Sequence, residues 1–426
     1  MRLMFPGPSQ PGESIRALSF RQVQFSKRAG LTAGSIALVL IGSCGQSVPS
    51  PPPTVPTTRA SSPTTEPPTS PTSSPSCAEA VEAGMSEAQR VGQLFAVGLE
   101  DDRLGPGEAA MISRYHFGSV TFIVTTTVGA TPIRSVTDAV QSLATSKATG
   151  RVGFFVAANQ EGGVIQALRG SGFSRMPSAV VQGRMSPSDL RTRAHEWGQQ
   201  LMSAGVNLNF APVMDVVPPG SDAQNQPIGV LMRGYGHDPA TVGDHGIAFL
   251  RGMARARVAT TAKHFPGLGR VKGNTDFAAR VVDRSTTRDD PYLEPFRQAV
   301  DAGVPFVMVA LATYTRIDPD DLAVFSSIVM GRMLRGDLHF TGVIVSDDLG
   351  EATAVAAIQP GQRAIDFLSA GGDMVVSKTV GPAVAMARAI VSRTRNNGSF
   401  RARVDDAVLR ILREKGRSGL LPCSGD

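Results

Sequence analysis

The sequence predicts an α/β protein folded as a (β/α)8, TIM-like barrel in a single domain. Two observations lead to this prediction. Eight short apolar runs recur between residues 93 and 377, and stretches with helical periodicity separate most of them. Continuous apolar runs of this length suit strands that are buried on both faces, as in a parallel sheet. Their alternation with helices favours a closed barrel, and a doubly wound open sheet is the alternative.

The expected strands follow one another in chain order. They are QLFAVGL (93–99), FGSVTFIV (117–124), GFFVAAN (153–159), VNLNFAPV (206–213), VATTAKHF (258–265), FVMVALA (306–312), GVIVSDD (342–348) and GGDMVVS (371–377). Between them, residues 188–205 and 290–303 show the apolar spacing of amphipathic helices. The globular part has about 350 residues, an ordinary length for this type of barrel.

Four polar side chains lie where predicted strands end. Asn159 closes the third run, and Lys263 and His264 close the fifth. Asp347 lies near the end of the seventh run. In a (β/α)8 barrel the C-terminal ends of all strands meet on one face, where the loops build a site. Each residue alone could be a hydrogen-bonded structural group, but four at the same end predict a shared pocket.

The start of the chain has the pattern of an export signal. Basic residues precede the apolar run 29–41, which is followed by Gly-Ser-Cys. This run is too short to span a bilayer core of about 30 Å comfortably. The cysteine directly after Leu-Ile-Gly-Ser resembles the lipobox of bacterial lipoproteins, which predicts a signal peptide at 1–43 and lipidation of Cys44. The alternative is an ordinary signal peptide with an incidental cysteine.

A low-complexity segment separates this signal from the predicted barrel. Residues 44–76 are mostly Pro, Ser and Thr, which have little apolar surface to bury, so we expect a disordered tether. The barrel domain then covers residues 77–426. Cys77 and Cys423 lie at its two ends, and in an oxidising compartment such a pair predicts a disulfide bond. Two free thiols are the alternative, and nothing in the sequence indicates a metal site.

The formal net charge of +6 comes mainly from the signal. Residues 1–43 contain five basic residues and one acidic residue, a net charge of +4, which leaves +2 for the rest of the chain. The domain contains no block of like charges, so it lacks the basic surface expected of a nucleic-acid-binding protein. Contact with the membrane is expected through the lipid alone.

Four motifs resemble those of family-3 glycoside hydrolases in order and spacing. They are NQEGGVIQAL (159–168), APVMDV (211–216), AKHFPGLG (262–269) and GVIVSDDLG (342–350). The resemblance covers roughly residues 80–415, and the second pair of motifs is the more specific. The chain looks most like the β-N-acetylglucosaminidase (β-hexosaminidase) lipoproteins with which actinobacteria act on peptidoglycan.

The resemblance implies a retaining mechanism in one catalytic domain. A carboxylate attacks the anomeric carbon, while a second group protonates the leaving oxygen. Asp347 stands at the position of the family's nucleophile, whereas Asp348 beside it could cap a helix. Lys263 and His264 match the pair that holds the sugar in relatives, and Arg233 matches a substrate-binding arginine.

Other positions depart from the family's pattern. Asn159 stands where relatives usually have Asp, and its amide can bind a hydroxyl but carries no charge. A second substrate-binding arginine of relatives aligns with Ala167, for which the nearby Arg169 is a candidate replacement. The histidine that often follows the sixth strand is replaced by Leu311. The change at Asn159 argues for altered affinity or sugar preference rather than loss of the pocket.

The proton donor is the largest departure. Relatives carry Asp-Ser-His after the Lys-His-Phe-Pro-Gly turn, and this Asp-His pair is their mobile acid/base. The same positions here are Asn274, Thr275 and Asp276. Asp276 is the candidate acid/base, since a carboxylate can deprotonate water and, once desolvated by a bound sugar, can carry a proton. The alternative is that Asp276 is a solvated loop residue.

The resemblance thus predicts an exported, membrane-anchored enzyme that faces the cell wall. Its expected reaction is removal of terminal β-linked N-acetylglucosamine from peptidoglycan fragments, in cell-wall turnover and recycling. A monomer is expected, and no metal or organic cofactor is needed for carboxylate and proton chemistry. Two alternatives stay open: a non-catalytic lipoprotein that binds muropeptides, and a β-N-acetylglucosaminide phosphorylase.

Overall fold

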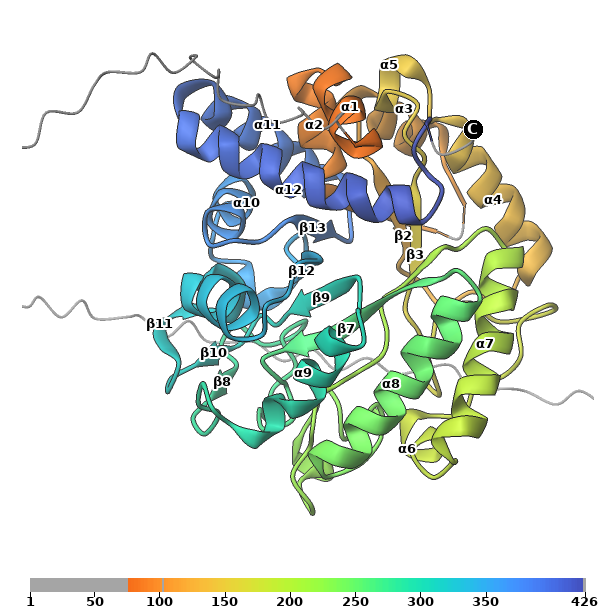
Figure 1. Cartoon of the computed structure of the whole chain (residues 1–426), viewed down its shortest axis with the longest axis vertical. Coiled ribbons are helices and arrows are strands. Elements are labelled where there is room, and N and C mark those ends of the chain that lie inside the picture. The colour runs from red at the N-terminus through yellow and green to blue at the C-terminus, as the bar shows by residue number, and fades with distance from the viewer. Residues whose placement is uncertain (1–75, 102, 424–426) are drawn as a thin grey trace, which may run out of the picture. The chain divides into compact units, whose positions relative to one another are not determined.

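Eight parallel strands close into a barrel in the computed structural model, which describes residues 76–101 and 103–423 (Figure 1). In barrel order they are β1 (Phe95–Leu99), β2 (Ser119–Phe122), β3 (Phe155–Ala158), β6 (Leu208–Asn209), β7 (Ala259–Phe265), β9 (Phe306–Val309), β12 (Val343–Asp348) and β13 (Met374–Ser377). The first and last strands pair directly, with Phe95 opposite Val375. The predicted (β/α)8 barrel is therefore confirmed, and the open sheet is wrong.

Each strand lies within the apolar run predicted for it. The main difference is β6, which pairs regularly over only two residues of the run 206–213. Pro212 has no amide hydrogen to donate to a ladder, and Val213 pairs with Lys263 only as an isolated bridge. Two small sheets lie outside the barrel. In one, β4 (Gln160–Gly162) pairs with β5 (Ile165–Gln166) in antiparallel fashion. In the other, β10 (Thr313–Tyr314) pairs with the antiparallel β11 (Asp318–Leu322) and with the parallel β8 (Val282–Asp283).

Helices surround the barrel (Figure 1). They are α1 (Cys77–Gly84), α2 (Glu87–Gln93), α3 (Pro106–Tyr115), α4 (Ala130–Ser142), α5 (Ser146–Thr149), α6 (Ala179–Gln182), α7 (Pro187–Ser203), α8 (Pro239–Arg255), α9 (Glu294–Asp301), α10 (Pro360–Ser369), α11 (Val380–Asn396) and α12 (Gly398–Arg417). Short 3₁₀ turns are η1 (Asp222–Gln224), η2 (Pro291–Leu293), η3 (Ala323–Phe325) and η5 (Thr353–Val355), and η4 (Ile328–Asp337) is a π-helix.

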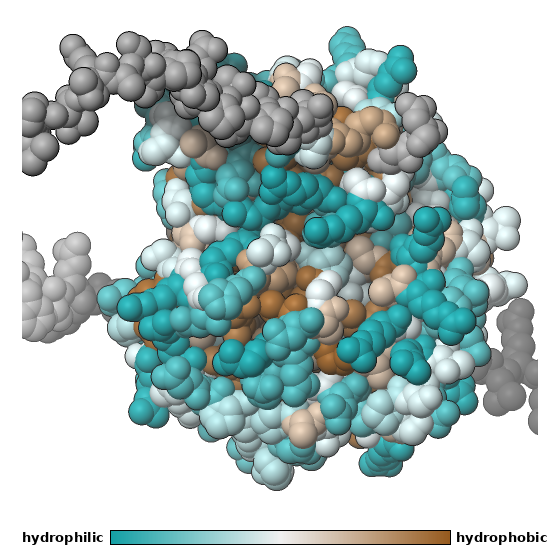
Figure 2. Space-filling model, viewed as in Figure 1, coloured by the Kyte–Doolittle hydropathy of each residue, from teal (hydrophilic) through white to brown (hydrophobic). Residues whose placement is uncertain are grey.

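The two predicted helical stretches correspond to α7 and to η2 with α9. Ser186 caps α7 by accepting a hydrogen bond from the Asp189 amide, and Pro187 occupies the first turn, where no amide hydrogen is needed. Figure 2 shows hydrophilic residues over most of the surface of the face drawn in Figure 1, as expected of helices that bury their apolar side against the barrel. No helix among residues 76–101 and 103–423 is long and apolar enough to cross a membrane.

The N-terminal end of the barrel is closed by Lys415 of α12. Its fully buried ammonium group donates to the side-chain oxygen of Gln93 (2.7 Å) and to the carbonyl oxygens of Gly118 (2.6 Å) and Gly153 (2.9 Å). These acceptors precede β1, β2 and β3. Burial lowers the pKa of Lys415 well below its usual value. This end is therefore filled, which leaves the opposite end for a site.

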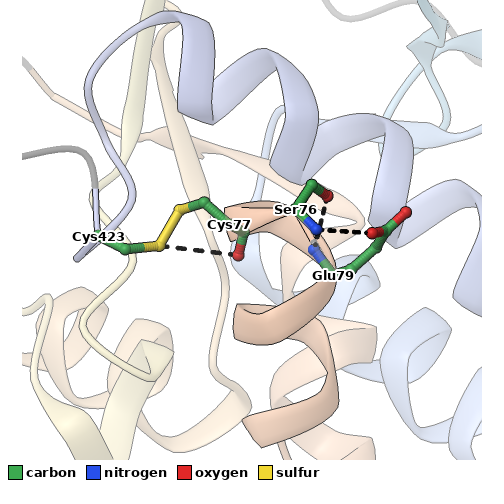
Figure 3. Close-up of a disulfide and its surroundings, with 4 residues drawn as sticks. All are labelled: Ser76, Cys77, Glu79 and Cys423. Carbon is green, nitrogen blue, oxygen red and sulfur yellow. Dashed lines mark hydrogen bonds between the residues drawn. A yellow bond between two sulfur atoms is a disulfide. The ribbon is translucent and has the colours of Figure 1, made fainter. Parts of the chain in front are cut away.

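The two ends of the described domain are joined by a disulfide bond between Cys77 and Cys423 (Figure 3). Cys77 begins α1 and Cys423 follows α12, and these helices pack side by side (Figure 1). Ser76 caps α1 through reciprocal hydrogen bonds with Glu79. The predicted signal peptide, Cys44 and residues 44–75 of the predicted tether lie outside the described residues.

Candidate active site

A pocket of about 330 Å³ opens at the C-terminal end of the barrel strands. It is lined by all six side chains that the sequence singled out as catalytic or substrate-binding, namely Asn159, Arg233, Lys263, His264, Asp276 and Asp347. Three lie in the last residues of β7 and β12, and the other three lie in the segments that follow β3, β6 and β7. The rule that strand ends converge on one face therefore accounts for their meeting. The predicted shared pocket is present.

Glu161 holds the cationic side of this pocket together. Its buried carboxylate contacts the ammonium group of Lys263 at 2.6 Å and binds the guanidinium of Arg233 through two hydrogen bonds of 2.8 Å. Burial alone would raise the pKa of Glu161, but these two cations outweigh it and lower the value to about 2. The Lys263 ammonium also donates to the side-chain oxygen of Asn159 at 2.8 Å. The four groups form a rigid polar wall.

His264 is oriented by Asp215, which is fully buried. One Asp215 oxygen contacts the histidine Nδ1 at 2.8 Å, and the other accepts from the backbone amides of His264 (3.1 Å) and Leu268 (2.7 Å). The Nδ1 atom therefore carries a hydrogen toward Asp215, and Nε2 is left toward Arg233 at 3.4 Å. Asp215 thus fixes both the ring and the start of the following loop.

Asp347 and Asp348 are adjacent but have different surroundings. Asp348 is buried and accepts hydrogen bonds from the backbone amides of Gly350 (2.9 Å), Glu351 (3.1 Å) and Lys378 (2.9 Å). Asp348 therefore binds free amides, as the capping alternative suggested. One Asp347 oxygen accepts from the Asp348 amide at 2.8 Å, and the other has no hydrogen-bond partner among the described residues. Asp347 is the carboxylate with an oxygen left for a ligand.

The loop after β7 brings Asp276 to the pocket from another side. Its backbone carbonyl accepts hydrogen bonds from the amide (3.2 Å) and hydroxyl (2.8 Å) of Thr353. Its carboxylate forms an ion pair of 2.8 Å with Lys378, the residue that follows β13. Asp276 therefore lies at the pocket rim, where its partly exposed carboxylate is paired with Lys378.

Three residues of this site were not singled out from the sequence. Glu161 and Asp215 lie inside the motifs that carried the resemblance, but only their contacts reveal that they hold other side chains in place. Lys378 directly follows the eighth predicted strand. The strand-end rule that selected Asn159 could therefore have found it.

The proposed replacement of a substrate-binding arginine by Arg169 is wrong. Ala167 lines the pocket, but Arg169 lines a neighbouring groove instead. Its guanidinium donates to the carbonyl oxygens of Gln166 (2.8 Å), Gly163 (3.3 Å) and Val164 (3.1 Å), which hold it against its own loop. Leu311 is buried in the core, so no polar group replaces the family's histidine there.

The comparisons with known proteins all point to the same family. Residues 87–414 match the glycosyl hydrolase family 3 N-terminal domain. The chain is 32% identical to a β-hexosaminidase of Alkalilimnicola ehrlichii over 289 residues, which is 66% of this chain and 79% of that protein. It is 34% identical to a β-hexosaminidase of Nitrosospira multiformis over 52% of this chain and 63% of that protein.

Solved structures agree with this match. The β-N-acetylhexosaminidase of Beutenbergia cavernae is 43% identical with a TM-score of 0.76, covering 78% of this chain and 99% of that one. A family 3 β-N-acetylglucosaminidase from a Paenibacillus species is 28% identical with a TM-score of 0.71, covering 79% and 63%.

The central role of Glu161 can be tested by its stability effect. Glu161→Gln leaves Lys263 and Arg233 buried without their shared carboxylate, so the free energy of unfolding at pH 7 should fall by about 3–5 kcal/mol. Glu196→Gln replaces an exposed carboxylate of α7 and should change the free energy of unfolding by less than about 0.5 kcal/mol. Urea unfolding measures both variants.

The difference in free energy of unfolding between the wild type and Glu161→Gln should depend on pH. The pKa of Glu161 is lowered in the folded protein, so its stabilisation is complete above the ordinary value of 4.5 and is lost as the pH falls toward about 2. The wild type should therefore lose its stability advantage over Glu161→Gln as the pH falls from 4.5 toward about 2. Equal losses in the two variants at pH 7 would contradict the role of Glu161.

Proposed function

Because the chain belongs to glycosyl hydrolase family 3 and is a glycoside hydrolase, we propose that it removes terminal β-linked N-acetylglucosamine from peptidoglycan fragments. The observation that carries this proposal is the pocket, where one Asp347 oxygen makes no hydrogen bond to any residue that the structure describes and Lys263 and Arg233 are held by Glu161. The similar proteins named β-hexosaminidase and β-N-acetylhexosaminidase support an N-acetylhexosamine as the sugar.

The proposed reaction is a double displacement. Asp347 attacks the anomeric carbon as the bond to the leaving oxygen breaks. Asp276, which takes up a proton when the bound sugar desolvates it, passes that proton to the leaving oxygen. Asp276 then takes a proton from water, whose oxygen displaces Asp347 from the sugar. Lys263, Arg233 and Asn159 hold the sugar hydroxyls, with His264 oriented beside them. Their fixed orientation lowers the entropic cost of reaching the transition state.

A second groove supports a peptide-bearing fragment as the substrate. It borders the sugar pocket at Val164, measures about 740 Å³, and contains Arg169 and Arg175 but no carboxylate. Its apolar residues include Val181 and Met232, which are 44% and 46% exposed. Cationic and apolar groups together suit an acidic leaving group with alkyl side chains, which is the chemistry of a peptide-substituted amino sugar.

The roles proposed for Asp347 and Asp276 predict different losses of activity when each is replaced. Asp347→Asn should lower turnover of every β-N-acetylglucosaminide by about 10⁴-fold, because no covalent intermediate forms. Asp276→Asn should lower turnover of an unactivated disaccharide by about 10²–10⁴-fold. With a dinitrophenyl glycoside, whose leaving group needs no proton, the first step of Asp276→Asn should survive. Burst and steady-state kinetics distinguish the two variants.

Azide provides a further check on Asp276. A small anionic nucleophile needs no base, so it should restore the second step in Asp276→Asn and yield a glycosyl azide. Wild-type activity of Asp276→Asn on the disaccharide would remove Asp276 from the mechanism. No release of dinitrophenolate by the wild-type protein would instead favour a non-catalytic muropeptide-binding protein.

The groove predicts a preference among leaving groups. Arg175 makes no hydrogen bond or ion pair with another described residue. Arg175→Gln should therefore lower kcat/KM about two- to fivefold for a disaccharide that carries an acidic peptide, the size expected for an exposed charge pair. Hydrolysis of neutral chitobiose should be unchanged. Arg193→Gln, on the exposed side of α7, is the matched control, and equal effects on both substrates would contradict the preference.

A phosphorylase remains the second candidate function, because Lys378 gives the pocket a partly exposed cation next to Asp276. A phosphate ion could pair with such a group and replace water as the acceptor. Assays with and without phosphate separate the two reactions. Phosphate-dependent formation of N-acetylglucosamine 1-phosphate would establish the phosphorylase, and free N-acetylglucosamine at an unchanged rate would establish the hydrolase.

We also propose that the protein is exported and held at the membrane by lipid on Cys44, with the barrel facing the cell wall. A diacylated cysteine attaches a protein stably because it carries more than one acyl chain. Cys44→Ala should move the protein from the membrane fraction to the soluble or secreted fraction, as followed by immunoblotting. An unchanged distribution would refute the lipid anchor.

A further inference from the structure

Lys378 connects two sides of the pocket. It directly follows β13, whereas Asp276 belongs to the loop after β7, and β12 and β9 lie between these strands in the barrel. The Lys378 ammonium group lies 2.8 Å from an oxygen of Asp276 and 3.8 Å from an oxygen of Asp348. The contact with Asp276 therefore spans the pocket opening from one strand end to another.

The carboxylate of Asp276 has no other hydrogen-bond partner among the described residues. The remaining contacts of Asp276 involve its backbone: its amide donates to Asn274 at 3.0 Å, and its carbonyl accepts from Thr353. These bonds fix the course of the loop but leave the side chain free to rotate. The ion pair with Lys378 is what restrains the carboxylate itself.

The position and charge of Lys378 suit it to hold a neighbouring carboxylate. Its backbone amide donates to Asp348, whose carboxylate is fixed by other loop amides. Burial alone would lower the pKa of Lys378, but the charges of Asp276, Asp348 and Asp347 outweigh it and raise the value. The group therefore stays cationic and remains paired with the Asp276 carboxylate.

We propose that Lys378 is a positioning residue, whose ammonium group holds the Asp276 carboxylate at the pocket for proton transfer. This inference rests on the proposed function and on the role of Asp276 in it. Without the ammonium group, the loop keeps its backbone bonds, but the carboxylate samples orientations that do not face the scissile bond. Steps that need proton transfer should slow, and steps that need none should not.

The test compares Lys378→Met, Lys378→Arg and a control, Lys147→Met. Lys147 is an exposed residue of α5 whose side chain makes no hydrogen bond or ion pair with another described residue. For Lys378→Met we expect kcat on chitobiose to fall about 10- to 100-fold, less than the 10²–10⁴-fold effect of a complete acid/base group. KM should change little, Lys378→Arg should recover part of the rate, and Lys147→Met should match the wild type.

A dinitrophenyl glycoside separates this role from a general structural one. In single-turnover experiments, Lys378→Met should release dinitrophenolate within about twofold of the wild-type rate, because this leaving group needs no proton. Equal losses on both substrates, or no loss on chitobiose, would refute the positioning role. A wild-type protein that cleaves neither substrate would instead refute the proposed function, and the inference would fall with it.

Discussion

The candidate site depends on one buried carboxylate, that of Glu161. Two cations, Lys263 and Arg233, are mostly buried at the C-terminal end of the barrel, where an unpaired charge would be costly. Glu161 forms ion pairs with both and joins the ends of β3 and β7 to the loop after β6. The lysine can then hold Asn159, and the arginine can face His264. The pocket is thus built around a pre-formed ion cluster.

The two ends of the barrel use buried charge differently. At the N-terminal end, Lys415 has three acceptors, and Asp373 is surrounded by arginines of the outer helices. These groups are satisfied by the protein itself and stabilise the fold. At the C-terminal end, one Asp347 oxygen has no hydrogen-bond partner within residues 76–101 and 103–423, and Lys378 remains partly exposed. These polar groups still have hydrogen-bonding capacity to offer, which makes this end of the barrel suitable for a ligand.

Asn274 and Asp276 stand where the resemblance to the family predicts an Asp-His pair, and the structure shows how they organise the loop. Asn274 uses its side-chain oxygen on the backbone amide of Asp276 and does not contact that residue's carboxylate. The partner of the carboxylate comes from the far end of the sequence, at Lys378. A change within one loop is thus linked to a residue about a hundred positions away, and only the barrel brings the two together.

The sequence by itself determined the barrel, its strands and six of the residues that line its pocket. Apolar periodicity is local, and parallel strands place every strand end on one face, so Lys263 and Asp347 could be assigned to a common site. The contacts of Glu161, Asp215 and Lys378 were decided by the tertiary structure alone. Which cation meets which carboxylate depends on strand order, side-chain reach and burial, and none of these is encoded in the spacing of neighbouring residues.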